Sequence, residues 1–113
     1  MHEMAMSESL VEIVEEEGRK HGFTKVRTIR IELGALGHVE PEALRFCFDA
    51  VTRGTIAEGA HLDIMTVAGA GFCLDCGQTV PLTERFGACP TCGTYRVQMT
   101  AGDDLRIKEL EVD

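Results

Sequence analysis

The sequence has no tryptophan, and aromatic residues make up only 5% of its 113 positions. A folded core must therefore be built from aliphatic side chains, which the 44% hydrophobic content is sufficient to supply. No segment approaches the roughly 20 consecutive apolar residues of a membrane-spanning helix. The chain starts with MHEMAMSESL, which lacks the basic stretch and apolar run of a signal peptide, so we expect a cytoplasmic protein without a membrane anchor.

Basic residues are also scarce, with 11 Lys and Arg against 19 Asp and Glu, which gives a net charge of −8. An acidic surface repels phosphate backbones, and the Lys and Arg residues are scattered rather than clustered. The charge therefore argues against nucleic acid as the main partner. It is compatible with cations or basic protein surfaces.

Hydrophobic periodicity predicts helices over residues 4–21 and 40–53. In the first helix we expect Met6, Leu10, Ile13 and Val14 to face the core. Gly22 suits the left-handed position that ends this helix. Pro41 suits the first position of the second helix, where its missing N–H costs nothing. Alternation predicts strands, and a glycine-rich hinge is expected at 69–71. The predicted strands are 24–33, 61–68, 94–99 and 105–112.

This element order predicts the α/β class, as an α+β mixed sheet with two helices on one face and an inserted zinc-ribbon domain. We expect residues 1–69 and 102–113 to form the α/β domain. Residues 70–101 would form the ribbon.

The inserted segment carries the most specific motif, two C-x-x-C pairs separated by twelve residues. The pairs are Cys73 with Cys76 and Cys89 with Cys92. Two residues between cysteines let one tight turn direct both sulfurs at a single ion, so two turns supply the four ligands of a tetrahedral Zn²⁺. Zinc coordination in such small modules contributes on the order of 10–16 kcal/mol to folding at neutral pH.

Four thiolates leave no open coordination position, so we expect a structural zinc site and no zinc enzyme. A pair of redox disulfides or an iron–sulfur cluster are the alternatives for these cysteines. The fifth cysteine, Cys47, lies on the apolar face of the second predicted helix and is interpreted as a buried core thiol.

A second candidate metal site lies at the start of the chain. Initiator methionine is normally retained before a bulky residue, so Met1 should keep a free α-amine next to His2. That amine, the backbone amides of His2 and Glu3 and the His2 imidazole would form a planar nitrogen set, which suits Ni²⁺ or Cu²⁺. A carboxylate from Glu3 or Glu40 would add an axial oxygen. A solvated terminal histidine without function is the alternative.

Together these features resemble the HypA/HybF family of hydrogenase nickel-incorporation proteins. The resemblance covers the whole chain and rests on a set of segments in a fixed order. These are MHEM-x-M, IELGALGHVEPEALRFCFDAV, GAHLDI, C-L-D-C-G with C-P-T-C-G, and LRIKELEV.

The resemblance implies a nickel metallochaperone, not an enzyme, that binds Ni(II) transiently through its N-terminus with His2 as the essential side chain. It would deliver the metal to the large-subunit precursor of [NiFe]-hydrogenase together with a HypB-type GTPase, and in some organisms serve urease maturation. Met1, His2 and Glu3 match the family's nickel motif, Glu40 falls where some members carry a further acidic ligand, and the four insert cysteines match the zinc ligands.

Two alternatives share the cysteine pattern without nickel transfer. One is a nucleic-acid-binding zinc ribbon of the transcription or translation machinery, which the acidic charge disfavours. The other is a protein-interaction adapter that uses zinc only for folding.

Overall fold

The structure is a computed structural model that describes residues 2–113. The two helices are α1 (His2–His21) and α2 (Pro41–Val51), and a short 3₁₀ turn, η1 (Ala35–Gly37), precedes α2. The strands are β1 (Val26–Gly34), β2 (His61–Val67), β3 (Ala70–Cys73), β4 (Thr79–Pro81), β5 (Val97–Ala101) and β6 (Leu105–Val112).

The chain forms two compact units. The first contains the chain up to Ile31 together with Val39–Ile64 and Ile107–Asp113. The second contains Glu32–His38 and Met65–Arg106. The compact units are defined by packing alone. The division into domains 1–69 with 102–113 and 70–101 therefore stays a prediction.

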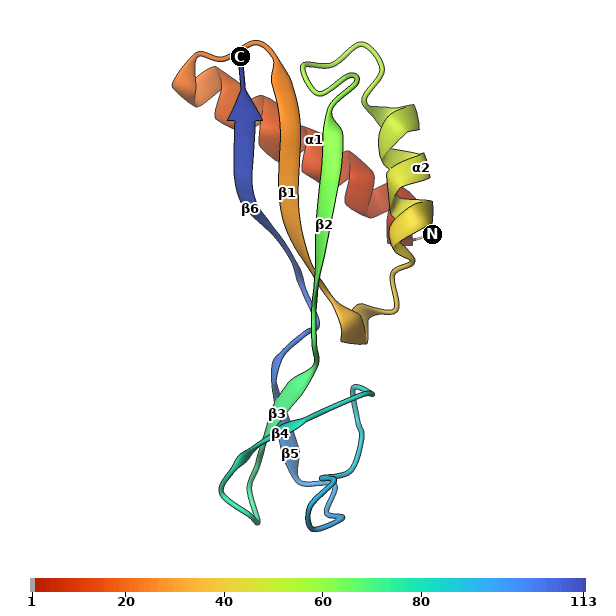
Figure 1. The fold of residues 1–113 in the computed structure, drawn as a ribbon, viewed down its shortest axis with the longest axis vertical. Coiled ribbons are helices and arrows are strands. Elements are labelled where there is room, and N and C mark those ends of the chain that lie inside the picture. The colour runs from red at the N-terminus through yellow and green to blue at the C-terminus, as the bar shows by residue number, and fades with distance from the viewer. Residues whose placement is uncertain (1) are drawn as a thin grey trace. The chain divides into compact units, whose positions relative to one another are not determined.

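The first unit contains a mixed sheet in the order β2-β1-β6. β1 and β2 run in the same direction because α2 connects them, and β6 runs in the opposite direction (Figure 1). α1 lies across one face of the sheet, and α2 packs against α1 (Figure 1). The hydrophobic core between these elements is mainly aliphatic, and Phe48 is its buried aromatic side chain. Its most buried members are Leu10, Val14, Val26, Ile29, Ile31, Leu44 and Phe48.

The buried stripe of α1 differs from the predicted one. Ile13 is 48% exposed, whereas Ser7 and Val11 are buried together with Leu10 and Val14. A polar serine can be buried here because its hydroxyl is hydrogen-bonded. The Ser7 hydroxyl donates to the Glu3 carbonyl at 2.8 Å and to the Leu44 carbonyl at 3.4 Å. The prediction for Ile13 is therefore wrong, because the buried stripe runs through Ser7, Leu10, Val11 and Val14 and leaves Ile13 outside it.

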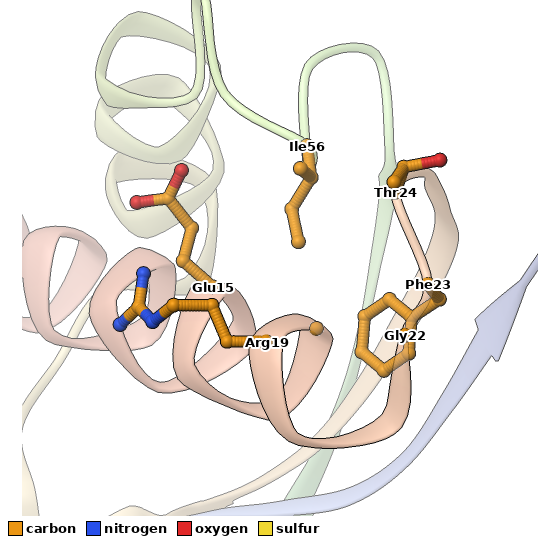
Figure 2. Close-up of a pocket in the computed structure, with 7 residues that line it drawn as sticks. Glu15, Arg19, Gly22, Phe23, Thr24 and Ile56 are labelled. Carbon is orange, nitrogen blue, oxygen red and sulfur yellow. The ribbon is translucent and has the colours of Figure 1, made fainter.

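The end of α1 and the start of α2 are formed by the residues that the sequence predicts. α1 ends where Gly22 adopts a φ of 78° and its N–H donates to the Gly18 carbonyl at 2.8 Å. Beyond it the chain turns so that Phe23 lies across a pocket from the last turns of the helix (Figure 2). α2 begins with Pro41 in its first turn, and the Glu40 carboxylate caps it by accepting from the Glu42 N–H at 3.2 Å.

One arginine ties the three strands of the first unit together. The Arg30 guanidinium on β1 lies 3.3 Å from the Asp63 carboxylate on β2. It also lies 3.1 Å from Glu109 and 3.6 Å from Glu111, both on β6. These ion pairs join the central strand β1 to both of its neighbours and thereby stabilise the strand order β2-β1-β6.

The second unit contains a small antiparallel sheet in the order β4-β3-β5. β3 was not predicted, because Ala70 and Gly71 were expected to form a hinge; they are instead paired with β4 and β5. Gly69 serves close packing, since a Cβ there would lie 2.4 Å from the Leu82 carbonyl oxygen. The last strand of this sheet begins at Val97 rather than at residue 94 as predicted, and Tyr95 ahead of it is 77% exposed.

The predicted fold class is confirmed, because two helices and mixed sheets make up the chain and the four motif cysteines lie in the inserted segment. Within residues 2–113, neither helix has the length and apolar character needed to cross a membrane.

Replacing Leu10 by Ala should lower the free energy of unfolding by about 2–5 kcal/mol, because Leu10 is 1% exposed and its removal leaves a cavity. The matched change Ile13→Ala should cost less than about 1 kcal/mol. Urea denaturation followed by helix circular dichroism measures both values. Equal losses would show that the helix packs in its predicted rather than its observed orientation.

Candidate metal sites

The first cysteine pair forms a tight turn at the end of β3. The Cys73 N–H donates to the Gln78 carbonyl at 2.9 Å, and the Gly77 N–H donates back to the Cys73 carbonyl at 2.8 Å. Gly77 has a φ of 69°, a left-handed conformation that the absence of a Cβ makes easy. The turn directs the Cys76 N–H at the Cys73 sulfur, 3.2 Å away. A backbone donor thus stabilises negative charge on that sulfur.

The second cysteine pair repeats this turn. The Cys89 N–H donates to the Thr94 carbonyl at 2.7 Å, and the Gly93 N–H donates to the Cys89 carbonyl at 2.8 Å. Gly93 has a φ of 79°, the same left-handed conformation as Gly77 in the first turn. The two C-x-x-C-G segments therefore present their sulfurs in the same local geometry.

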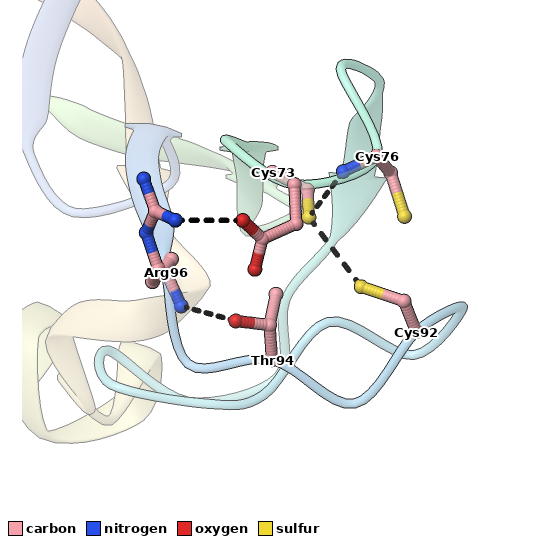
Figure 3. A network of polar contacts seen from close by, with 6 residues as sticks. Cys73, Cys76, Cys92, Thr94 and Arg96 are labelled. Atoms are coloured by element: carbon pink, nitrogen blue, oxygen red, sulfur yellow. Dashed lines mark hydrogen bonds and ion pairs between the residues drawn. The ribbon is translucent and has the colours of Figure 1, made fainter.

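The four thiols converge on one point. The sulfurs of Cys73, Cys76, Cys89 and Cys92 all lie within 4.8 Å of one another. The Cys73 and Cys92 sulfurs are 3.7 Å apart, so a thiol of each turn faces the other (Figure 3). Cys73 and Cys89 are buried, whereas Cys92 is exposed. Four soft donors at this separation make a metal-binding site with no position left for substrate.

The thiols differ in acidity. The backbone N–H of Cys92, and then that of Thr91, lower the pKa of Cys89 to about 6 against the opposing effect of burial. A hydrogen bond with the Cys92 thiol, and then burial, raise the pKa of Cys76 to about 12. The Cys89 thiol therefore loses its proton more readily than the Cys76 thiol. A bound cation displaces the remaining protons, because metal ligation deprotonates thiols outright.

An ion pair that the sequence does not predict joins the first cysteine turn to the segment that follows the second turn. Asp75, between the first two cysteines, accepts from the Arg96 guanidinium at 2.9 Å (Figure 3). The backbone of Arg96 makes two more hydrogen bonds. Its carbonyl accepts from the Leu74 N–H at 2.9 Å, and the Arg96 N–H donates to the Thr94 hydroxyl at 3.2 Å. No spacing signal could reveal Arg96, since it lies outside both motifs and reaches them only through the pairing of the folded ribbon.

The predicted nickel ligands fall partly outside the described structure. Met1 lies outside the described residues, and so does the side chain of His2. The structure brings Glu3 and Glu40 together through the backbone, because the Glu40 N–H donates to the Glu3 carboxylate at 3.4 Å. The first turns of α1 and α2 therefore meet where the chain starts. The fifth cysteine, Cys47, is buried on α2 as predicted.

The fold and the cysteine cluster define a small α/β metal-binding protein with an inserted cysteine ribbon. The model of the family HypA, described as hydrogenase/urease nickel incorporation, metallochaperone, matches residues 1–112. The chain belongs to this HypA family, so the resemblance seen in the sequence is confirmed. It is accordingly a nickel metallochaperone of hydrogenase/urease maturation and not an enzyme.

Curated relatives agree over the full length. The hydrogenase maturation factor HypA of Methylocella silvestris is 66% identical over 113 residues, which cover 100% of both chains. The HypA of Rhizobium leguminosarum bv. viciae is 57% identical over 112 residues, with 99% of each chain covered.

A solved structure has the same fold. The solution structure of the Ni metallochaperone HypA from Helicobacter pylori matches with a TM-score of 0.74, covering 97% of this chain and 96% of that one. Its sequence identity is 22%, so this likeness supports the fold alone.

Replacing Cys92 by Ser should strip the tightly bound metal from the ribbon, because a hydroxyl is a far poorer ligand for a soft site than a thiolate. The control Cys47→Ala removes a thiol outside the cluster and should retain one metal ion per chain. Plasma mass spectrometry of the purified variants measures the metal content. Equal metal content in both variants would exclude the four-cysteine cluster as the tight site.

Proposed function

We propose that the chain collects Ni(II) at its N-terminal residues and delivers it to the large-subunit precursor of [NiFe]-hydrogenase. The proposed ligands are the Met1 amine, the amide and imidazole of His2, the Glu3 amide, and a carboxylate oxygen from Glu3 or Glu40. The observation that carries this proposal is the contact between the starts of α1 and α2, where Glu3 and Glu40 meet.

The position of these residues in the fold favours coordination by backbone amides. The first four N–H groups of a helix have no intrahelical partner, so metal binding to the His2 and Glu3 amides breaks no helical hydrogen bond. Further along, the Ser7 hydroxyl bonds to the Glu3 and Leu44 carbonyls and holds this first turn against α2. The chain start would thus present its ligands from a supported position.

An axial carboxylate is compatible with the helix cap. Glu40 caps α2 with Oε1, and a carboxylate carries a second oxygen. Deprotonated amides and a planar set of nitrogen ligands suit Ni(II). Zn(II) prefers a tetrahedral site and so would favour the four cysteines. Ligands on a chain terminus can also be removed one at a time, which allows release to an acceptor.

For the cysteine cluster we propose structural Zn(II). Zinc–sulfur bonds of ~2.3 Å in a tetrahedron set sulfur–sulfur separations of about 3.8 Å. The 3.7 Å between the Cys73 and Cys92 sulfurs fits this value. When bound, the ion would hold the two turns together through Cys73, Cys76, Cys89 and Cys92.

The proposed partners follow from the maturation role. They are a HypB-type GTPase, the hydrogenase large-subunit precursor and, where urease is present, urease maturation proteins. We further propose a cytoplasmic location, where these partners would be assembled.

Replacing His2 by Ala should abolish nickel binding because it removes the imidazole from the chelate. The melting temperature and zinc content should not change. His21→Ala is the matched control, since His21 is an exposed α1 histidine paired only with Glu17 at 3.1 Å among residues 2–113. Calorimetric nickel titration measures the difference. Unchanged nickel uptake in the His2 variant would remove the N-terminal site from consideration.

A further inference from the structure

Two hollows in the first unit lie along a single face of α1. One has a volume of about 370 Å³ and is lined by Glu8, Val11 and Glu12 of the helix and by Val51 of α2. The other has a volume of about 300 Å³ and lies at the end of the helix, from Glu15 onward. The helix residues that line the two hollows follow one another at spacings of three and four, so both open on the same stripe.

Each hollow has an apolar wall opposite the helix. In the first it is Val51 at the end of α2. In the second, Ile56 and Phe23 stand across from Glu15 and Arg19, as Figure 2 shows. These volumes are at the lower end of the ~300–1,000 Å³ of small-molecule pockets, and both hollows are open to solvent. They suit single apolar side chains of another protein better than a cofactor.

The rim of these hollows is acidic. Glu8, Glu12 and Glu15 form no ion pair within residues 2–113. The one cation on the rim, Arg19, is held by the Glu16 carboxylate at 2.6 Å. Glu8 and Glu12 are therefore left to face an incoming group, and Glu15 adds its negative charge although Arg19 lies close enough to interact with it. This local charge favours Lys and Arg side chains next to the apolar contacts.

The spacing of the hollows limits the shape of what binds. Their helix residues are centred about eight positions apart, which corresponds to about 12 Å along α1. Two residues seven positions apart in a partner helix are separated by about 10.5 Å and lie on one face. An amphipathic helix with apolar residues at i and i+7 therefore matches both hollows.

We propose that this face of α1 is a docking groove for a cationic amphipathic helix of a partner protein. Two apolar side chains, seven positions apart, occupy the hollows beside Val51 and Ile56. Lys or Arg side chains of the same helix pair with Glu8, Glu12 and Glu15. This site is independent of the proposed nickel ligands.

The test uses isotope-labelled, zinc-loaded protein and a designed helical peptide of about 18 residues, long enough to be helical. The peptide carries Leu at positions i and i+7 and Lys around them. We expect saturable amide shifts in magnetic resonance spectra, confined to residues 8–23 and 51–56. A peptide with both Leu replaced by Ser, and one with the Lys replaced by Glu, should each bind at least about tenfold more weakly.

A pair of variants separates the groove from general acidity. Glu12→Lys should weaken binding of the cationic peptide by about tenfold, because it reverses a rim charge. Asp49→Lys makes the same change of charge on the exposed surface of α2, outside the residues lining either hollow, and should leave affinity unchanged. Thermal melting checks that both variants stay folded, and nickel titration of each should give the native result.

Several results would overturn the proposal. Equal binding of the Ser-substituted peptide, or equal weakening by both variants, would reduce the interaction to net charge. Shifts that fall elsewhere or do not saturate would exclude the groove. Shifts of residues 8–23 that depend on protein concentration without peptide would assign the face to a second copy of the chain.

Discussion

The packing of α1 is the interaction on which the rest of the first unit depends. Most of the stability of a helix in a folded protein comes from tertiary packing of its apolar face, so α1 depends on the burial of its apolar stripe. Leu10 and Val14 supply that burial against the sheet and α2. Because the helix begins at the second residue, the same packing also places the chain start beside α2. A property of the core thereby sets the surroundings of the proposed nickel site.

The second unit is stabilised in a different way. Around the cysteine turns its core is a small cluster of Val80 with Cys73 and Cys89, against which Val97 and Cys76 pack. So little apolar surface cannot offset the entropy of ordering the ribbon, and a metal bound to four thiolates would supply the difference. The protein thus combines a closed sulfur site, suited to permanent binding, with a proposed open nitrogen site, suited to exchange.

Local chemistry explains how much of this could be predicted from the sequence. Gly22, Pro41 and the cysteine turns each depend on a few neighbouring residues, and the structure bears out these predictions. The wrong predictions concern residues whose burial depends on contacts with distant parts of the chain. Ser7 can be buried because a carbonyl of α2 accepts its hydroxyl, and the buried stripe that runs through Ser7, Leu10 and Val14 leaves Ile13 exposed.

The same reason accounts for what was missed in the ribbon. β3 is short and contains glycine, so its strand character arises from its two partners rather than from propensity. The meeting of Glu3 with Glu40 likewise depends on how two helices pack, although both residues had been named as ligands from the sequence.

Calorimetric titration of nickel into zinc-loaded protein that begins at Met1, beside the same chain preceded by Gly-Ser, tests the central claim most directly. The extension converts the terminal amine into an amide and removes one ligand. One equivalent of nickel should bind the native chain and none the extended chain. Equal uptake by both would contradict coordination by the chain terminus.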